Sequence, residues 1–512
     1  MATSRRLASV ALLQFPSGLP LGLVWLAVPT WLTEQGVDLK LVGLVTLAQA
    51  PWTFKLLWAP LMDRYPVPFL GRKRGWIVVM QAVLLALGLA LAAVSDRPDA
   101  VVLVGILSLA TAFASASQDI AIDAHAVEVL RREEHGAAVG ARLAVYRTAM
   151  WISGRLSVTA AAWMGWPLVN VVLALLYVPS MLITRFAPEP ESVPPPPQTL
   201  REAVWGPFVG MLGQHRALEI LAFVLLYKLS DNLTQALTGP FLVQMGFSAL
   251  DRGVAVGTIG LFAIIIGTIL GGLLTQMVGL GPALWMGGFV QIFSNLGYAA
   301  VAHVGNNRPL MYGATGFEYF ATGLGNGAFG VLLLRLTQKR FSATQYALLS
   351  SLFTLPRVLA GPPAALMADA IGWRDFFIFT LVTGVPGLVM LYRFVPWGVR
   401  EPTFRVAEPT GRRALSRGAL VLRSAVVGVI ATALSVGSSL ALDAMRAHRA
   451  GRPFGWVDAA GRIAIPVTAG DVTTLVAVLV IGVLTALATA AGLAARRSAQ
   501  AENAGMPPPA VP

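Results

Sequence analysis

The chain has 512 residues, of which 56% are hydrophobic and only 12% are charged, and it contains no cysteine. Its mean hydropathy of +0.69 excludes an ordinary soluble domain, so the composition predicts an integral membrane protein. Disulfides and thiol chemistry are excluded. The net charge of +13 would indicate nucleic-acid binding if the basic residues clustered on a polar face, but they recur in short gaps between apolar runs. That pattern is typical of membrane orientation and predicts no nucleic-acid partner.

The N-terminal segment has Arg5 and Arg6 before an apolar run that continues to Trp31. This start resembles a signal peptide, but the run is interrupted by prolines and offers no small-residue cleavage site. We interpret it as the first, uncleaved span.

Crossing the hydrocarbon layer takes about 20 apolar residues, and fourteen segments qualify as candidate spans. They are 8–32, 40–62, 76–95, 100–126, 139–163, 166–186, 217–244, 252–278, 282–303, 310–335, 343–368, 374–396, 419–443 and 472–495. Four consecutive prolines (194–197) favour an extended linker between the sixth and seventh spans, followed by a candidate surface helix. Six spans, a linker and six more spans indicate a transporter built from two halves.

The sequence therefore predicts an all-α polytopic membrane protein with the following regions. They are a six-helix bundle (1–187), a proline-rich linker (188–216), a second six-helix bundle (217–397), a basic loop (398–418), two appended spans (419–496) and a tail without structure (497–512). A weak repeat between the ends of the second and eighth spans supports two related halves. The alternative is that any two apolar helices joined by a Gly/Pro turn look alike.

The basic residues of the short loops predict the orientation. Five groups fall on one side: 5–6, 64–74, 131–132, 339–340 and 400–417, against single basic residues on the other. This bias places both termini in the cytoplasm. The loop 446–471, which carries four arginines on the nominal outer side, argues against the orientation of the last two spans.

Polar residues interrupt the fourth span, where Gln118, Asp119 and Asp123 follow a run of small apolar residues. Asp119 and Asp123 are four residues apart and share one helix face. Ionisable side chains inside a span usually face the bundle interior or a water-filled path. At about 1.5 Å per residue, Asp119 and Arg147 lie at matched depth on consecutive spans, which predicts an ion pair between them.

The second half carries its own intramembrane charges. Lys228 and Asp231 share a face, with Gln235 one turn further along, and a neutralised structural pair is the alternative to a substrate-binding role. Arg357 has no acid in its own span and is the best candidate for binding an anion. Glu318 lies nearer the outer end of the tenth span.

Several residues admit two interpretations. Lys55 either extends to the inner interface or faces a cavity. Asp123 and Glu128 lie near the inner surface, where they pair with the basic loop or contact substrate. Gly267, Gly271, Gly272, Gly323, Gly325 and Gly327 are expected to allow close helix packing, since a nucleotide-binding loop would need a strand and a lysine. Neither a metal site nor a cofactor is expected.

The loop containing Asp63, Arg64, Arg72, Lys73 and Arg74 resembles the loop between the second and third helices of the major facilitator superfamily. An acid at a helix end beside clustered basic groups can hold one conformation of a two-state machine. We expect a gating role, with a positive-inside anchor as the alternative.

A closer resemblance, covering about residues 10–397, is to the AmpG-type muropeptide permeases. It is carried by Ser17-Gly18-Leu19-Pro20-Leu21, Phe54-Lys55-Leu56-Leu57-Trp58-Ala59-Pro60-Leu61-Met62-Asp63-Arg64-Tyr65, Ala116-Ser117-Gln118-Asp119-Ile120, Tyr146-Arg147, Tyr227-Lys228-Leu229-Ser230-Asp231, Phe317-Glu318, residues 341–350 and Val385-Pro386-Gly387. The Gln-Asp-Ile-Ala-x-Asp run is shared with acetyl-coenzyme A transporters. His125 and Ala126 depart from the permease pattern, which places the substrate in doubt more than the fold.

The resemblance implies a permease of the bacterial inner membrane that imports anhydromuropeptides, which are sugar-peptide fragments of cell-wall turnover, by proton symport. The alternatives are transport of another anionic solute such as acetyl-coenzyme A, or a non-transporting receptor; no nucleophile elbow or metal-ligand spacing favours an enzyme. The expected partners are the anionic substrate, protons and lipid, with a monomeric chain. The candidate substrate-binding residues are Lys55, Gln118, Tyr146, Arg147, Lys228, Gln235, Asn326 and Arg357. The candidate proton-coupling residues are Asp119, Asp123, Asp231 and Glu318.

Overall fold

The computed structural model describes residues 2–37, 48, 50–67, 70–97, 100–191, 195–212, 217–402, 417–449 and 453–465, with isolated residues between 471 and 489. The described residues form helices and turns and contain no strand, which confirms the all-α prediction. The chain divides into two compact units, Met1–Val204 with Glu219–Thr403, and Trp205–Leu218 with Phe404–Pro512. The first unit contains both predicted six-helix halves.

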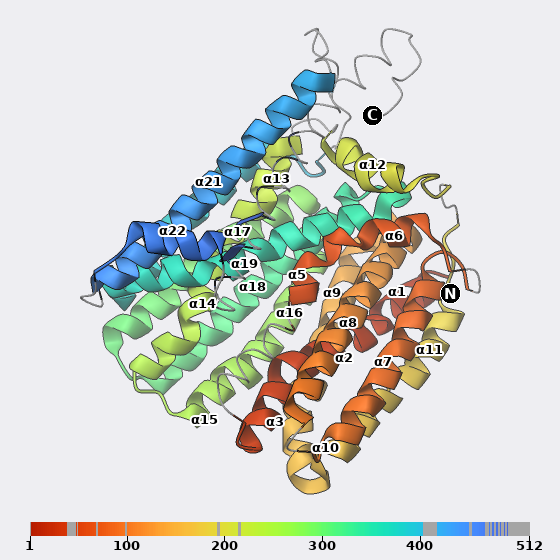
Figure 1. Ribbon diagram of the computed structural model, residues 1–512, viewed down its shortest axis with the longest axis horizontal. Coiled ribbons are helices and arrows are strands. Elements are labelled where there is room, and N and C mark those ends of the chain that lie inside the picture. Colours follow the sequence, from red (N-terminus) through yellow and green to blue (C-terminus); the bar gives the residue numbers. More distant parts are fainter. Residues whose placement is uncertain are drawn as a thin grey trace. The chain divides into compact units, whose positions relative to one another are not determined.

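The helices of the N-terminal half follow the predicted spans and are drawn from red to yellow in Figure 1. They are α1 (Ala2–Leu12), α2 (Gln14–Gly22), the π-helical turn η1 (Leu23–Ala27), α3 (Val28–Glu34), α5 (Ala50–Phe54), the 3-10 turn η3 (Lys55–Leu57), α6 (Ala59–Arg64), α7 (Arg74–Val94), α8 (Val101–Val129), η5 (Arg132–Glu134), α9 (His135–Trp151), the π-helical turn η6 (Ile152–Leu156), α10 (Ser157–Leu175) and α11 (Tyr177–Phe186). The turn between the fifth and sixth predicted spans falls at Gly165, whose φ of 76° lies in the left-handed region that favours glycine.

The C-terminal half follows after the linker helix α12 (Leu200–Leu212). Its elements are α13 (Ala217–Leu226), α14 (Leu229–Gln244), α15 (Ala249–Arg252), the π-helical turn η7 (Gly253–Ile259), α16 (Gly260–Met277), α17 (Leu280–Val304), α18 (Arg308–Leu336), η8 (Lys339–Phe341), α19 (Ser342–Ile371) and α20 (Trp373–Phe394). These helices pass from green to teal in Figure 1.

The second unit contains α21 (Arg417–Arg449) and α22 (Trp456–Ala464). Helix α21 matches the thirteenth predicted span, whereas the fourteenth, 472–495, lies largely outside the described residues. Within the connection 446–471, α21 continues to Arg449 and α22 forms a short helix. Ala459 and Ile463 of α22 are buried and lie four residues apart, so they share one face of the helix.

Seven described stretches are long and apolar enough to cross a membrane by themselves. They are Thr3–Glu34, Arg74–Val94, Val101–Val129, Arg132–Phe186, Ala249–Met277, Trp373–Arg393 and Val421–Ala441. Two of the other predicted spans are broken at a lysine: Lys55 begins η3 between α5 and α6, and Lys228 lies between α13 and α14. Breaks of this kind are typical of transporter helices that line a binding site.

Each half has its own apolar core. In the N-terminal half Trp31 stacks on Trp166, with 5.5 Å between ring centroids, and in the C-terminal half Phe241 packs edge-on against Phe377 at 4.8 Å. Where the halves meet, a Cβ on Gly136 or Gly140 of α9 would collide with the backbone of α16. The small residues Gly136 and Gly140 therefore let α9 of the N-terminal half pack closely against α16 of the C-terminal half.

The predicted packing role of the glycines in α16 and α18 is confirmed. A Cβ on Gly267, Gly271 or Gly323 would strike a backbone carbonyl of the facing helix. These two helices therefore approach each other backbone to backbone.

Candidate functional site

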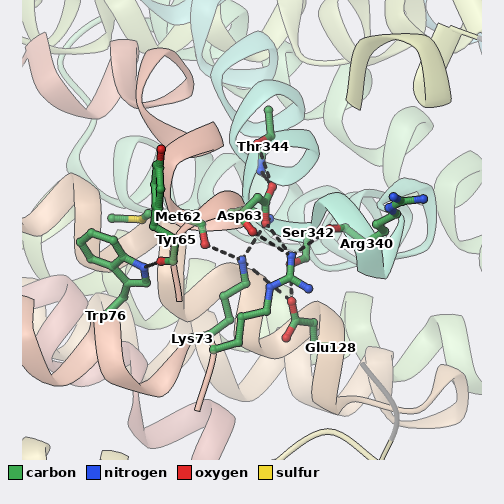
Figure 2. Close-up of polar contacts among 11 residues, drawn as sticks. Met62, Asp63, Tyr65, Lys73, Trp76, Glu128, Arg340, Ser342 and Thr344 are labelled. Atoms are coloured by element: carbon green, nitrogen blue, oxygen red, sulfur yellow. Dashed lines mark hydrogen bonds and ion pairs between the residues drawn. The ribbon is translucent and has the colours of Figure 1, made fainter. Parts of the chain in front are cut away.

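One end of the bundle carries the basic residues 72–74, 131–132 and 339–340, and we call it the basic end. Here Asp63, at the last turn of α6, is fully buried and reaches across to the other half (Figure 2). Its carboxylate accepts hydrogen bonds from the backbone N–H groups of Ala343 (3.2 Å) and Thr344 (2.9 Å) and from the Thr344 hydroxyl (2.8 Å). A carboxylate at the first turn of α19 satisfies orphan N–H groups and complements the helix dipole.

Basic side chains hold Asp63 in this position. Lys73 Nζ donates to Asp63 at 2.7 Å, and the lysine side chain is only 1% exposed. Arg72 lies 3.5 Å from the same carboxylate and donates to the Arg340 backbone carbonyl at 2.9 Å. A further acid, Glu128, accepts from the Ser342 hydroxyl at 2.6 Å. We call the group Asp63, Arg72, Lys73, Glu128, Ser342 and Thr344 the latch, because it joins the two halves.

The latch contains three of the five predicted gating residues. Arg74 instead binds the linker, where it pairs with Glu189 and donates to the Ala187 carbonyl. Arg64 stacks over the Tyr65 ring at 5.2 Å. The partners Ser342 and Thr344 were not predicted, because no capping pattern marks the start of α19 and Asp63 lies far away in the sequence.

The second polar group lies deeper in the bundle and also joins the halves. Asp123 of α8 pairs with Arg142 of α9 and lies 3.7 Å from Lys55 at the break before α6. Arg142 also interacts electrostatically with Tyr346 of α19, and its Nε and Nη2 lie 3.1 and 2.7 Å from the Gln14 amide, oriented with its oxygen toward the guanidinium. We call Lys55, Asp123, Arg142 and Tyr346 the cross-half cluster. Because Lys55 is buried and paired, it faces the bundle interior instead of extending to the interface.

The predicted Asp119–Arg147 ion pair was wrong. Asp119 accepts a hydrogen bond from Ser17 of α2. Arg147 is partly buried and has neither an ion pair nor a hydrogen bond among the described residues. Counting residues along a helix fixed the depth of the two side chains but not their direction around the helix axis. At a similar depth, it is Arg142 that points toward Asp123.

The C-terminal half holds a third polar group. Lys228 donates to Asp231 at 2.7 Å, and both side chains are 3% exposed. The Thr322 hydroxyl of α18 lies 3.3 Å from Asp231 and accepts from Gln235 at 3.0 Å. All members of this within-half cluster (Lys228, Asp231, Gln235 and Thr322) belong to the same half. The predicted shared face of Lys228 and Asp231 is confirmed.

A buried acid lies beside the within-half cluster. Glu318 of α18 is fully buried and accepts a hydrogen bond from Ser294 of α17. Like Asp119, it forms no ion pair with any described residue. The four predicted proton-coupling acids thus divide into two pairs. Asp123 and Asp231 are neutralised by cations, whereas Asp119 and Glu318 are held by serine hydroxyls.

The remaining candidates are amides, a tyrosine and an arginine. Gln118 is fully buried, and neither its amide oxygen nor its nitrogen has a partner among the described residues. The Asn326 amide oxygen is likewise buried without a partner there. Tyr146 is partly buried. Arg357 belongs to α19, but its side chain lies outside the described residues, and its anion-binding role stays a prediction.

The arrangement can do two kinds of chemistry. Buried cations and unpartnered amides suit a polar, carboxylate-bearing solute, and carboxylates without a cation can take up and release protons. Among the residues that the structure describes, no group of three His, Asp or Glu side chains is placed to hold a metal ion.

Two helical halves, broken helices at buried lysines and an ionic latch between the halves define a membrane carrier. In agreement, residues 10–341 match the model of the Major Facilitator Superfamily. Two solved structures share the fold. A bacterial homologue of the iron transporter ferroportin has a TM-score of 0.58 at 16% identity, covering 77% of this chain and 99% of that one. The proton:xylose symporter XylE has a TM-score of 0.57 at 11% identity, covering 78% and 98%.

Relatives of higher sequence identity show to which family of membrane carriers the chain belongs. The anhydromuropeptide permease of Escherichia coli strain K12 is 40% identical over 390 residues, which are 75% of this chain and 79% of that protein. A protein of Rickettsia felis named putative transporter AmpG 4 is 28% identical, over 75% of this chain and 95% of its own length. The chain therefore belongs to the anhydromuropeptide permease family of the Major Facilitator Superfamily.

Proposed function

We propose that this protein imports anhydromuropeptides across the bacterial cytoplasmic membrane by proton symport, as a monomer with both termini in the cytoplasm. The observation that supports this substrate is the 40% identity to the Escherichia coli permease over 390 residues. The basic end then faces the cytoplasm, as the positive-inside rule requires.

Substrate binding is assigned to the cations and amides between the halves. An anhydromuropeptide carries peptide carboxylates, so it needs a positive group that the protein's own acids leave available. Arg147 meets this requirement, because it is partly buried and unpaired among the described residues, whereas Arg142 and Lys228 already have acidic partners. Gln118 and Asn326 add unsatisfied amide groups suited to sugar hydroxyls or peptide groups.

Proton coupling is assigned to Asp119 and Glu318. A buried carboxylate without a cation favours its neutral, protonated form, whereas one beside a guanidinium or ammonium group favours its charged form. This narrows the four predicted proton-coupling residues to two, one in each half. Asp123 and Asp231 then keep the cations neutralised while the site is empty.

The latch determines which end of the carrier is closed in this conformation. With the basic end closed by the latch, substrate enters from the opposite end. Opening of the latch then releases substrate to the cytoplasm. Alternating access of this type is the motion that two packed halves permit around a central site.

Uptake of labelled anhydromuropeptide into proteoliposomes tests the proposal. An inward proton gradient is expected to drive accumulation, and a protonophore is expected to abolish it. Arg147→Gln should lower uptake at least tenfold, since a hydrogen bond to a charged group contributes about 1.5–3 kcal/mol. Arg155→Gln is the matched control and should stay within about twofold, because the exposed Arg155 guanidinium packs against Gly257. Absence of uptake would contradict the proposed substrate. Uptake that does not depend on the proton gradient would contradict the proposed proton coupling.

A further inference from the structure

Helix α8 presents a line of polar residues to the interior of the N-terminal half. Ser108, Thr111, Ser115 and Asp119 follow spacings of three and four residues and therefore share one helix face. They are 0%, 3%, 0% and 8% exposed. We call them the α8 polar stripe.

The hydroxyls of the α8 polar stripe are not used to stabilise the helix. Ser108, Thr111 and Ser115 have no hydrogen-bond partner among the described residues. A buried serine commonly donates to the carbonyl one turn earlier, as Ser117 does to Phe113 at 2.8 Å on the same helix. An unpartnered buried hydroxyl costs about 1–3 kcal/mol, so three on one face indicate a purpose other than packing.

A cavity lies against this stripe. Its volume is about 20 Å³, and its lining includes Thr111, Asn170 and Tyr177 together with leucines from α2 and α7. This volume is room for one water molecule, which needs at least two polar partners. The Thr111 hydroxyl and the Asn170 amide oxygen are both buried without a partner among the described residues, and both residues line the cavity.

Polar groups lie on both sides of the cavity. Asn170 Nδ2 donates to the Ser95 hydroxyl at 2.9 Å, and the exposed Gln35 donates to the Ser95 carbonyl at 2.8 Å. Ser95 caps the far end of α7, which begins at Arg74 in the basic end, so it lies about 30 Å from the latch. Toward the middle of the bundle, Tyr177 lines the cavity, and Asp119 lies one helical turn beyond Ser115 on the same face of α8.

We propose that the α8 polar stripe, with the water-sized cavity beside it, is a proton path from the end opposite the latch to Asp119. The path runs inside the N-terminal half and is separate from the route of the substrate between the halves. A proton enters near Gln35 and Ser95. Each water or hydroxyl oxygen along the path accepts one proton and passes on another. The Asp119 carboxylate accepts the last proton and becomes neutral, and no other group is oxidised or reduced.

This inference rests on the proposed proton symport, and a double variant tests it. Thr111→Val with Ser115→Ala removes two hydroxyls while nearly preserving side-chain volume. The matched control is Thr268→Val with Ser180→Ala, because these hydroxyls are equally buried but donate to the carbonyls of Ile264 and Leu176. Both variants are reconstituted in vesicles that contain a pH-sensitive dye.

Two rates are compared in these vesicles. One is acidification driven by anhydromuropeptide, and the other is exchange of labelled for unlabelled anhydromuropeptide at equal pH, which needs no net proton movement. The stripe variant should acidify at least tenfold more slowly while its exchange rate stays within twofold, and the control should keep both rates.

Three results would overturn the inference. Acidification by the stripe variant at the rate of the unmodified protein would place the proton path elsewhere. An equal fall of exchange and acidification would make the stripe structural. If the unmodified protein exchanges substrate but does not acidify the vesicles, the proposed proton symport would be wrong, and the proposed proton path would be wrong with it.

Discussion

The cross-half cluster and the within-half cluster use the same chemistry in different places. Each contains a buried lysine at a helix break and an aspartate, which is buried in the within-half cluster and partly buried in the cross-half cluster. In the cross-half cluster, Arg142 also interacts electrostatically with Tyr346 of the other half, so we expect its surroundings to change when the halves separate. The Lys228–Asp231 pair lies on one side of the interface and moves as a body. We therefore expect the cross-half cluster to respond to the conformational state and the within-half cluster to keep its charge arrangement through the cycle.

The largest expected effect comes from removing Asp123. Asp123→Ala leaves Arg142 and Lys55 buried without their acid, and breaking a buried pair costs about 3–5 kcal/mol of unfolding free energy. Thermal unfolding in detergent measures the loss. Asp375→Ala is the control, because the Arg374–Asp375 pair is more than half exposed and such pairs contribute about 0–1 kcal/mol. Equal unfolding temperatures for the two variants would show that Asp123 does not hold the cross-half cluster.

A smaller effect on stability is expected when both members of the within-half pair are replaced. Lys228→Met with Asp231→Leu removes both charges, and such replacements of buried pairs are often neutral in stability. Uptake should nevertheless fall at least tenfold, since the cluster loses its charges. Asp231→Ala alone is the comparison and should unfold at a lower temperature than the double variant. A double variant as unstable as the single one would mean that packing, not charge, dominates at this site.

The smallest expected effect comes from removing the Tyr346 hydroxyl of the cross-half cluster. Tyr346→Phe removes the hydroxyl that interacts with Arg142 of the other half, which should shift the equilibrium toward the open basic end by about 1 kcal/mol, or roughly fivefold. A single cysteine placed at the buried Ala343 of the otherwise cysteine-free chain should then be alkylated faster. Tyr227→Phe is the control, because that hydroxyl donates to the Leu284 carbonyl within one half. The same alkylation rate in both variants would make Tyr346 irrelevant to gating.

Much of the fold could be predicted from the sequence because long apolar runs leave few alternatives. The helices α8 and α18 begin and end within three residues of the predicted spans. The Lys228–Asp231 pair was also predictable, since residues three apart on one helix share a face whatever surrounds them. The domain boundaries and the orientation in the membrane stay predictions.

Contacts between helices were harder to predict. Depth counting paired Asp119 with Arg147, but hydrogen bonding depends on how each helix is rotated about its axis. Arg142 and Arg147 are five residues apart and point about 140° away from each other. The capture of the α19 N-terminus by Asp63 was missed for a related reason: its partners lie 280 and 281 residues away in the sequence.

The latch distance is the most direct test of alternating access. Spin labels at Arg132→Cys and Lys339→Cys, both exposed at the basic end, report the separation of the two halves there. With anhydromuropeptide and an inward proton gradient, we predict two distance populations, and Asp63→Asn should increase the longer one. A single distance that neither substrate nor Asp63→Asn changes would contradict a carrier that alternates by opening the latch.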